Sequence, residues 1–343
     1  MFTGIMLVIL GAIFLGTFAF PSKFVKNYEW ENLWGSFFFT GLLVVPVVVS
    51  SLVIKGLWST YMDVPFGITA GVVALGFMWG CGFSMWGYGL SMLGLSLGYA
   101  LTMGTMALVG SMLPFFMGNA DKAGTPGGLM VIIGILICIG GVALNGFAGL
   151  KREKTSENAV DAAAAKKHMI KGIIICIVAG VLSSGLNVGF HIGTNIGNIT
   201  QLSIEKYGNA ASMAGLSVWT LIFIGGSIAS CGYSIILLTK NKTWKNFLVK
   251  ESPKNLMFTA AMGIAHFACI FLYGLGSWKL GVLGTSVGFA IFQSGSLLIG
   301  NGFGFFTGEW ANAPQVSKNY LYAGLSVLIG GIIIVSIGNA LIS

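Results

Sequence analysis

Long apolar runs, separated by short polar segments, make up most of this chain. Several runs exceed the roughly 18 apolar residues that identify a membrane-spanning helix, and a helix of about 20 residues crosses a hydrocarbon core of about 30 Å. The runs lack the alternation of apolar and polar residues that is typical of strands in a membrane barrel. We therefore predict ten membrane-spanning helices, at residues 2–20, 33–54, 66–88, 93–117, 128–149, 169–190, 211–238, 256–277, 282–307 and 321–341.

The composition supports a membrane protein. Hydrophobic residues make up 55% of the 343 residues and charged residues only 8%, whereas a soluble domain has about 25% charged residues. No Lys or Arg precedes the first apolar run, so we expect its helix to persist rather than to be removed as a signal peptide. The five cysteines all fall inside predicted spans and lack the spacing of metal ligands, so we predict neither a disulfide framework nor a metal site.

The positive charges lie mainly on one side of the predicted bundle. The odd-numbered connections between spans hold 14 of the 18 Lys and Arg residues, and the other connections hold four. Cytoplasmic loops of membrane proteins carry an excess of Lys and Arg. We therefore expect the odd-numbered connections in the cytoplasm and both termini outside. Because this asymmetry explains the net charge of +8, we expect the protein to bind no nucleic acid.

The chain divides into two similar halves. Residues 151–168 are charged and rich in alanine, and they read as a cytoplasmic linker between residues 1–150 and 169–343. The pattern of residues 93–101 recurs at 283–291, and that of 115–118 recurs at 305–308, both with an offset of 190. Chance similarity of apolar helices is the alternative. With five spans each, the second copy is inverted in the bilayer, which predicts an all-α membrane protein of two inverted five-helix repeats.

Polar residues inside the spans are the candidates for substrate contact, because lipid-facing positions rarely hold them. The sixth span carries a polar face along residues 184–198, which includes Asn187 and His191 at helical spacing. A seam of hydrogen bonds between helices is the structural alternative. Tyr99 in the fourth span and Gln293 in the ninth add neutral hydrogen-bonding groups, which suit the hydroxyl groups of a sugar.

Aromatic residues of the third span complete the predicted substrate site. Trp79 and Trp86 lie on one helical face and can stack on the apolar face of a sugar ring, although plain packing between helices is an equal alternative. The predicted substrate-binding residues are Trp79, Trp86, Tyr99, Asn187, His191 and Gln293.

Several function classes are not supported by the sequence. It contains no Walker loop for ATP and no Gly-x-Ser-x-Gly or His-Glu-x-x-His motif of a hydrolase, so we expect a transporter and not an enzyme. The few acidic residues lie away from the centres of the spans, which disfavours a site for a divalent or strongly cationic solute.

Five motifs resemble those of the L-rhamnose/proton symporter family, within the drug/metabolite transporter superfamily. They are Pro21-x-Lys23-x-Val25-Lys26-x-Tyr28-x-Trp30-Glu31-x-x-Trp34, Met78-Trp79-Gly80-x-Gly82, Leu93-Gly94-x-Ser96-x-Gly98, Lys171-Gly172 and Gly308-Glu309-Trp310-x-Asn312-Ala313. One departure concerns Phe83 and Met85, where members of that family carry asparagines. The resemblance implies ten helices in two inverted repeats and uptake of L-rhamnose or a related sugar together with a proton. It also implies a location in the bacterial cytoplasmic membrane and no cofactor besides the co-transported proton. Export of metabolites or drugs is the runner-up, and a sensor without transport is a third possibility.

Coupling to protons requires a group that titrates. A neutral sugar gains nothing from the membrane potential, whereas one elementary charge gains about 2.3 kcal/mol per 100 mV. His191 is the favoured proton carrier because it lies on the polar face, and Glu31 in the first motif is its rival. Lys23, Lys26 and Trp34 of that motif are candidate gating residues. His266 lies among apolar residues, so we expect a neutral, hydrogen-bonded core histidine.

Overall fold

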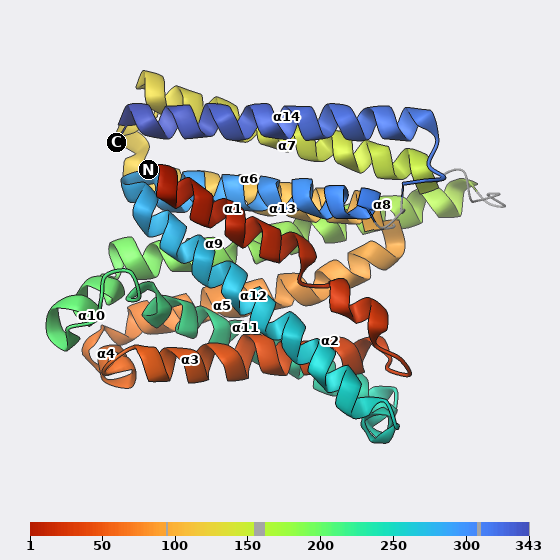
Figure 1. Ribbon diagram of the computed structural model, residues 1–343, viewed down its shortest axis with the longest axis horizontal. Coiled ribbons are helices and arrows are strands. Elements are labelled where there is room, and N and C mark those ends of the chain that lie inside the picture. The colour runs from red at the N-terminus through yellow and green to blue at the C-terminus, as the bar shows by residue number, and fades with distance from the viewer. Residues whose placement is uncertain (94, 154–161, 307–309, 343) are drawn as a thin grey trace.

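A computed structural model of the protein describes the backbone of residues 1–93, 95–153, 162–306 and 310–342. Within these ranges the chain forms helices and no strand, and the long helices lie side by side as an elongated bundle (Figure 1). The long helices are α1 (Phe2–Thr17), α5 (Phe66–Leu93), α6 (Leu95–Asn119), α7 (Pro126–Glu153), α8 (Ala162–Ser183), α11 (Gly215–Lys240), α12 (Ser252–Leu280), α13 (Gly284–Phe306) and α14 (Gln315–Ile342).

Shorter segments connect or interrupt the long helices. They are η1 (Phe20–Phe24), α2 (Trp30–Phe38), η2 (Phe39–Val44), α3 (Val45–Val53), α4 (Leu57–Asp63), η3 (Ala120–Lys122), α9 (Gly185–His191), η4 (Ile192–Ile196), α10 (Ile199–Tyr207), η5 (Thr243–Leu248) and η6 (Gly281–Leu283). Two of them are π-helical turns: η2 lies in an apolar stretch, and η4 lies within the polar face at residues 184–198. The π-turn η2 precedes Pro46, which has no N–H for the helical hydrogen bond and whose ring crowds the preceding turn.

The prediction of an all-helical membrane protein is confirmed. In the described part of the chain, nine helical stretches are long and apolar enough to cross a membrane. Each of them overlaps one of the ten predicted spans. The remaining prediction, at 282–307, coincides with α13, which is not among the nine. Gln293 and Asn301 lie within α13 and lower its hydropathy.

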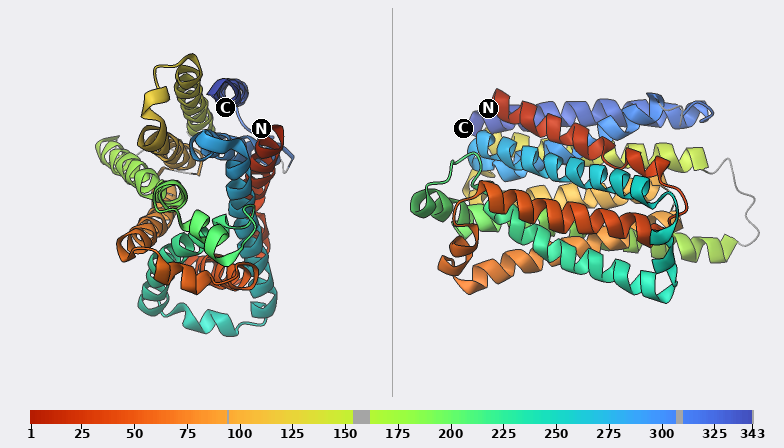
Figure 2. Two further views of the ribbon diagram at one scale, coloured as in Figure 1. Left: turned by 90° about the vertical axis from the view of Figure 1, so that its left-hand side faces the viewer. Right: turned by 60° about the horizontal axis from the view of Figure 1, so that its bottom comes forward.

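Helices from the two halves of the chain pack in pairs. Figures 1 and 2 show α14 along α7 at one edge of the bundle, and α1 packs along α12 and α13. Glycines let α7 and α14 approach closely, since a Cβ at Gly331 would lie 2.9 Å from the backbone nitrogen of Cys138. Because lipid gives helices no hydrophobic reason to associate, this close contact of backbones is what holds such a pair together.

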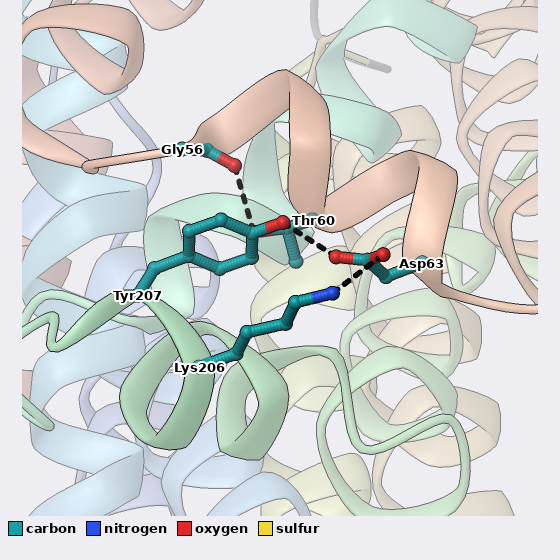
Figure 3. A network of polar contacts seen from close by, with 5 residues as sticks. All are labelled: Gly56, Thr60, Asp63, Lys206 and Tyr207. Carbon is teal, nitrogen blue, oxygen red and sulfur yellow. Dashed lines mark hydrogen bonds and ion pairs between the residues drawn. The ribbon is translucent and has the colours of Figure 1, made fainter.

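The end of the bundle that carries both termini also carries α4 and α10 (Figures 1 and 2). Figure 3 shows Lys206 and Tyr207 of α10 reaching Asp63 of α4: Lys206 Nζ lies 2.8 Å from Asp63 Oδ1, and the Tyr207 hydroxyl donates to the other oxygen. The hydrogen bond from Lys206 keeps the pKa of Asp63 below its usual range. Asn209 adds two bonds, accepting from the Lys55 N–H at 2.8 Å and donating to the Lys55 carbonyl at 2.9 Å. These contacts fasten α10 to α4.

Two glycines at this end provide a matched test of the contact. Both have a positive φ, +63° at Gly56 and +66° at Gly208, a conformation that costs an L-residue about 1–2 kcal/mol. A Cβ at Gly56 would also lie 2.3 Å from Tyr207 Cδ1, whereas a Cβ at Gly208 has no neighbour within 4 Å. We predict that Gly56→Ala lowers the apparent unfolding temperature in detergent clearly more than Gly208→Ala does. Equal decreases would mean that the Tyr207 ring does not rest on Gly56.

Candidate functional site

One cavity opens near the end that carries the termini. It has a volume of about 710 Å³, which falls in the usual range for small-molecule sites. We call it the large cavity. Its wall combines aromatic rings with neutral hydrogen-bonding groups, and none of its described lining residues is Asp, Glu, Lys or Arg. Its main polar and aromatic members are Asn119, Phe190, His191, Asn195, Trp219 and Thr285.

His191 lies in the wall of the large cavity, at the end of α9. Its Nδ1 is 2.8 Å from Thr285 Oγ1 and 3.0 Å from Asn195 Nδ2. With the Asn195 amide donating to Nδ1, the proton of the neutral ring is on Nε2. Nε2 is buried beside Gly118, which also lines the cavity, and has no hydrogen-bond partner among the described residues. A ligand hydroxyl at this point would complete the hydrogen bonds of the ring.

An aromatic pair forms another part of the wall. The rings of Phe190 and Trp219 stack with centroids 4.0 Å apart and an angle of 7° between their planes. Trp219 Nε1 is buried, has no hydrogen-bond partner in the described part of the chain, and lies against Gly274, another lining residue. Both rings are almost fully buried, so the pair backs the wall of the cavity, and its N–H donor can reach a ligand only when that wall moves. Trp219 is not among the predicted site residues, because a tryptophan in a mainly apolar span gives no signal of its own.

A polar partition closes the inner end of the large cavity. The Asn187 amide donates at 2.7 Å to the carbonyls of Gly110 and Thr285, and its oxygen accepts from the Tyr273 hydroxyl. The Tyr273 ring stacks on Phe292 at a centroid distance of 4.9 Å. Asn187 is fully buried and its side chain is occupied by protein partners. Asn187 is therefore part of the partition between two cavities.

A second, small cavity lies behind the partition and has a volume of about 60 Å³, far below the usual range of ligand sites. Phe292 forms part of its wall, together with three of the predicted residues: Trp79, Trp86 and Gln293. Gln293 Oε1 is buried without a partner among the described residues, while its Nε2 contacts Met106 Sδ at 3.1 Å. The side chain of Tyr99, the remaining predicted contact in this region, lies outside the described residues.

His266 also lines the small cavity, inside a group of aromatic rings. It stacks on Trp79 with centroids 6.0 Å apart and planes 6° apart, and Phe83 lies at 6.2 Å. Phe18, Phe37 and Phe223 complete the enclosure. We expected a hydrogen-bonded histidine here, but His266 Nδ1 is buried and has no hydrogen-bond partner in the described part of the chain. The sequence could not reveal this site because its rings come from distant segments.

The opposite end of the bundle is closed by polar contacts between the first motif and the connection after α11. Glu31 is buried and accepts hydrogen bonds from Asn241 at 3.0 Å and Thr243 at 2.7 Å. The Asn255 amide bonds both the N–H and the carbonyl of Lys26, at 3.2 and 2.7 Å.

The two other candidate gating residues lie near these contacts. Lys23 lies 5.7 Å from the centroid of the Phe20 ring. Trp34 packs against Phe37 and Phe83, so it links this end to the aromatic group around His266. The predicted site residues thus fall into three places: the large cavity with its partition, the small cavity, and the closed end.

The role of Asn187 can be tested against a matched asparagine. Replacing Asn187 by Ala leaves the Tyr273 hydroxyl and two carbonyls without their partner, and each such buried group costs about 1–3 kcal/mol. Asn198 faces the large cavity, is exposed and has a φ of +51°, a conformation that glycine adopts without strain. We predict that Asn187→Ala lowers the apparent unfolding temperature in detergent strongly and Asn198→Gly only slightly. Similar stability of the two variants would argue against the partition.

Comparison with known proteins gives the family. Residues 1–341 match the family of L-rhamnose-proton symport proteins. The chain is 27% identical to the L-rhamnose-proton symporter of Yersinia pestis (strain Pestoides F), over 98% of each protein. It is 26% identical to the L-rhamnose-proton symporter of Pectobacterium atrosepticum, again over 98% of each. These are transporters and not enzymes. The match over almost the whole length shows that the chain belongs to the L-rhamnose-proton symport protein family.

Proposed function

We propose that this protein takes up L-rhamnose or a related sugar together with a proton across a bacterial cytoplasmic membrane. The observation that carries the proposal is the family match over residues 1–341. The large cavity supports it, since its described lining offers amides, hydroxyls and aromatic rings but no carboxylate, lysine or arginine. Such a lining suits a neutral polyhydroxylated solute. It gives little support to export of a cationic drug or an anionic metabolite, the runner-up function.

We propose that ten helices cross the membrane, with α13 as the ninth. Both termini lie at the same end of the bundle (Figures 1 and 2), which requires an even number of crossings. We further propose that residues 1–150 and 169–343 are inverted repeats joined by the linker 151–168, most of which lies outside the described residues. In the order of the spans, α1 corresponds to α8, α5 to α12 and α6 to α13. The helix contacts support this symmetry, because α1 packs on α12 and α13 while its counterpart α8 packs on α5 and α6.

We propose that the end with the termini faces the outside and that the closed end faces the cytoplasm. The Lys-rich connections support this orientation, because they meet at the closed end, where Asn255 bonds Lys26. The large cavity then opens outward. In this arrangement the sugar enters beside His191 and Trp219, and it reaches Trp79, Trp86, Tyr99 and Gln293 only after the partition of Asn187 and Tyr273 rearranges.

The proton carrier is proposed to be His191. His191 lies in the wall of the large cavity, and its Nε2 is buried there without a partner among the described residues, so it is free to take part in proton transfer once that wall moves. Glu31 is the rival, but its carboxylate accepts two hydrogen bonds within the closed end, at the opposite end of the bundle from the opening of the large cavity. Lys26, Lys23 and Trp34 are proposed to act as gating residues because they border these contacts. Opening of the cytoplasmic end would have to break the bonds to Glu31 and Lys26.

Transport can be tested with purified protein in vesicles. We predict counterflow of labelled L-rhamnose or a related deoxy sugar, and an increase in thermal stability with the same sugar, since a ligand of the folded state stabilises it. Gln293→Ala and Trp219→Phe should weaken binding, by up to roughly 1–3 kcal/mol for a lost hydrogen bond to a buried group. Saturable binding without counterflow would indicate a sensor, and no response to any sugar would refute the proposal.

Coupling can be tested separately from sugar binding. We predict that cells with His191→Gln equilibrate the sugar without moving protons, so that sugar addition no longer makes the medium alkaline. Glu31→Gln should keep the alkalinisation, since it preserves a hydrogen-bonding group at the closed end. The opposite result, with protons moving in His191→Gln and not in Glu31→Gln, would assign the proton to Glu31.

A further inference from the structure

A third hollow lies on the outer surface of the bundle, apart from both cavities. It is a groove of about 350 Å³ between α2, α11 and α12, closed at one end by η5. Its lining is almost entirely apolar. Phe39, Ile235 and Leu256 in its wall are 54%, 51% and 44% exposed, which in a membrane-spanning bundle means exposure to lipid. We call this hollow the lipid-facing groove.

The depth of the groove matches one half of a bilayer. On α11 its lining residues run from Cys231 to Leu238, which spans about 10 Å at 1.5 Å per residue. α11 ends at Lys240, and Trp244 and Phe247 of η5 close the groove at its membrane-surface end. Half of a hydrocarbon core is about 15 Å thick. The groove therefore starts near the membrane surface and ends inside one leaflet.

Three lysines are neighbours in sequence of residues at the surface end of the groove. Lys240, Lys242 and Lys245 lie within two residues of the lining residues Leu238 and Trp244 in sequence, and all three are exposed. No ion pair with a carboxylate is found for them among the described residues. The nearby acid Glu31 is buried and already holds Asn241 and Thr243, so it does not neutralise them.

We propose that the groove is a specific site for an anionic glycerophospholipid. One acyl chain fills the apolar groove, and the phosphate lies among the Lys240, Lys242 and Lys245 ammonium groups. Basic sites between membrane helices on the cytoplasmic side bind anionic headgroups in this way, and each lysine adds to the preference over a zwitterionic lipid. Trp244 lies between the two parts: its ring lines the groove and its Nε1 donates to Thr239 Oγ1 at 3.2 Å.

The site is independent of the sugar but lies beside the closed end. The same η5 turn that lines the groove contains Thr243, which bonds Glu31 through its hydroxyl and Asn32 through its carbonyl. A lipid packed on Trp244 and Phe247 would therefore hold η5 in the position where these bonds form.

Quenching of Trp244 fluorescence tests the proposal in wild-type protein. Vesicles contain phosphatidylglycerol as the minor lipid and phosphatidylethanolamine as the major lipid, with bromine on the acyl chains of one or the other. The signal of Trp244 is the difference between wild type and Trp244→Phe. We expect brominated phosphatidylglycerol to quench this signal several-fold more than its fraction in the membrane predicts. Quenching in proportion to the membrane fraction of each lipid would overturn the proposal.

Charge removal tests the headgroup contact. The double variant Lys242→Gln and Lys245→Gln should lose the excess quenching by phosphatidylglycerol. Its control, Lys171→Gln with Lys318→Gln, removes the same charge from α8 and α14, near the ends of their spans on the predicted cytoplasmic side, and should keep the excess. Retention of the excess in both double variants would show that these lysines do not bind the headgroup, and loss in both would show a general effect of charge. Either result contradicts the proposed site.

Discussion

The side chain of Asn187 joins four helices at the centre of the bundle. It belongs to α9, donates to carbonyls in α6 and α13, and accepts from the Tyr273 hydroxyl of α12. Asn187 is fully buried, so a group that loses its bond to this amide has no water to replace it, and these groups depend on each other. The partition between the cavities exists because one amide satisfies three buried groups at once. It also places the walls of both cavities in contact with the same few side chains.

Different parts of the bundle use different kinds of contact. The pair α7 and α14 relies on glycines whose backbones touch, a contact that holds only in one geometry. The region around the cavities instead contains π-turns at η2 and η4, unpartnered polar atoms at His191 and Gln293, and stacked aromatic rings. Polar groups without partners and irregular helical turns are features that a structure tolerates where it must bind or move. We therefore interpret the pair α7 and α14 as a rigid edge of the bundle and the region around the cavities as its mobile part.

The sequence predicted the helices well because a span in lipid needs only length and apolarity, which are local properties. It predicted a polar face at residues 184–198, and Asn187 and His191 do lie one turn apart. Their surroundings were not predictable, since the hydrogen-bond partner of Asn187, Tyr273, lies 86 residues away in the sequence. The same limit explains His266, whose flanking residues are apolar and whose enclosing rings include Trp79 and Phe223 from other helices. The segments α4 and α10 were missed because they are too short for a hydropathy signal.

The two histidines lie on opposite sides of the partition, which matters for the coupling of proton and sugar. His191 is on the side of the large cavity, next to Thr285, while His266 is on the side of the small cavity, stacked on Trp79. The Asn187 amide bonds the carbonyl of the same Thr285, and Tyr273 of α12 lies two helical turns after His266. Adding a proton to His191 changes which atoms of its ring can donate, and therefore which role the Thr285 hydroxyl takes. Thr285 therefore connects His191 to the partition: its hydroxyl contacts the histidine, and its carbonyl accepts from Asn187. Joint movement of a proton and a sugar requires a connection of this kind.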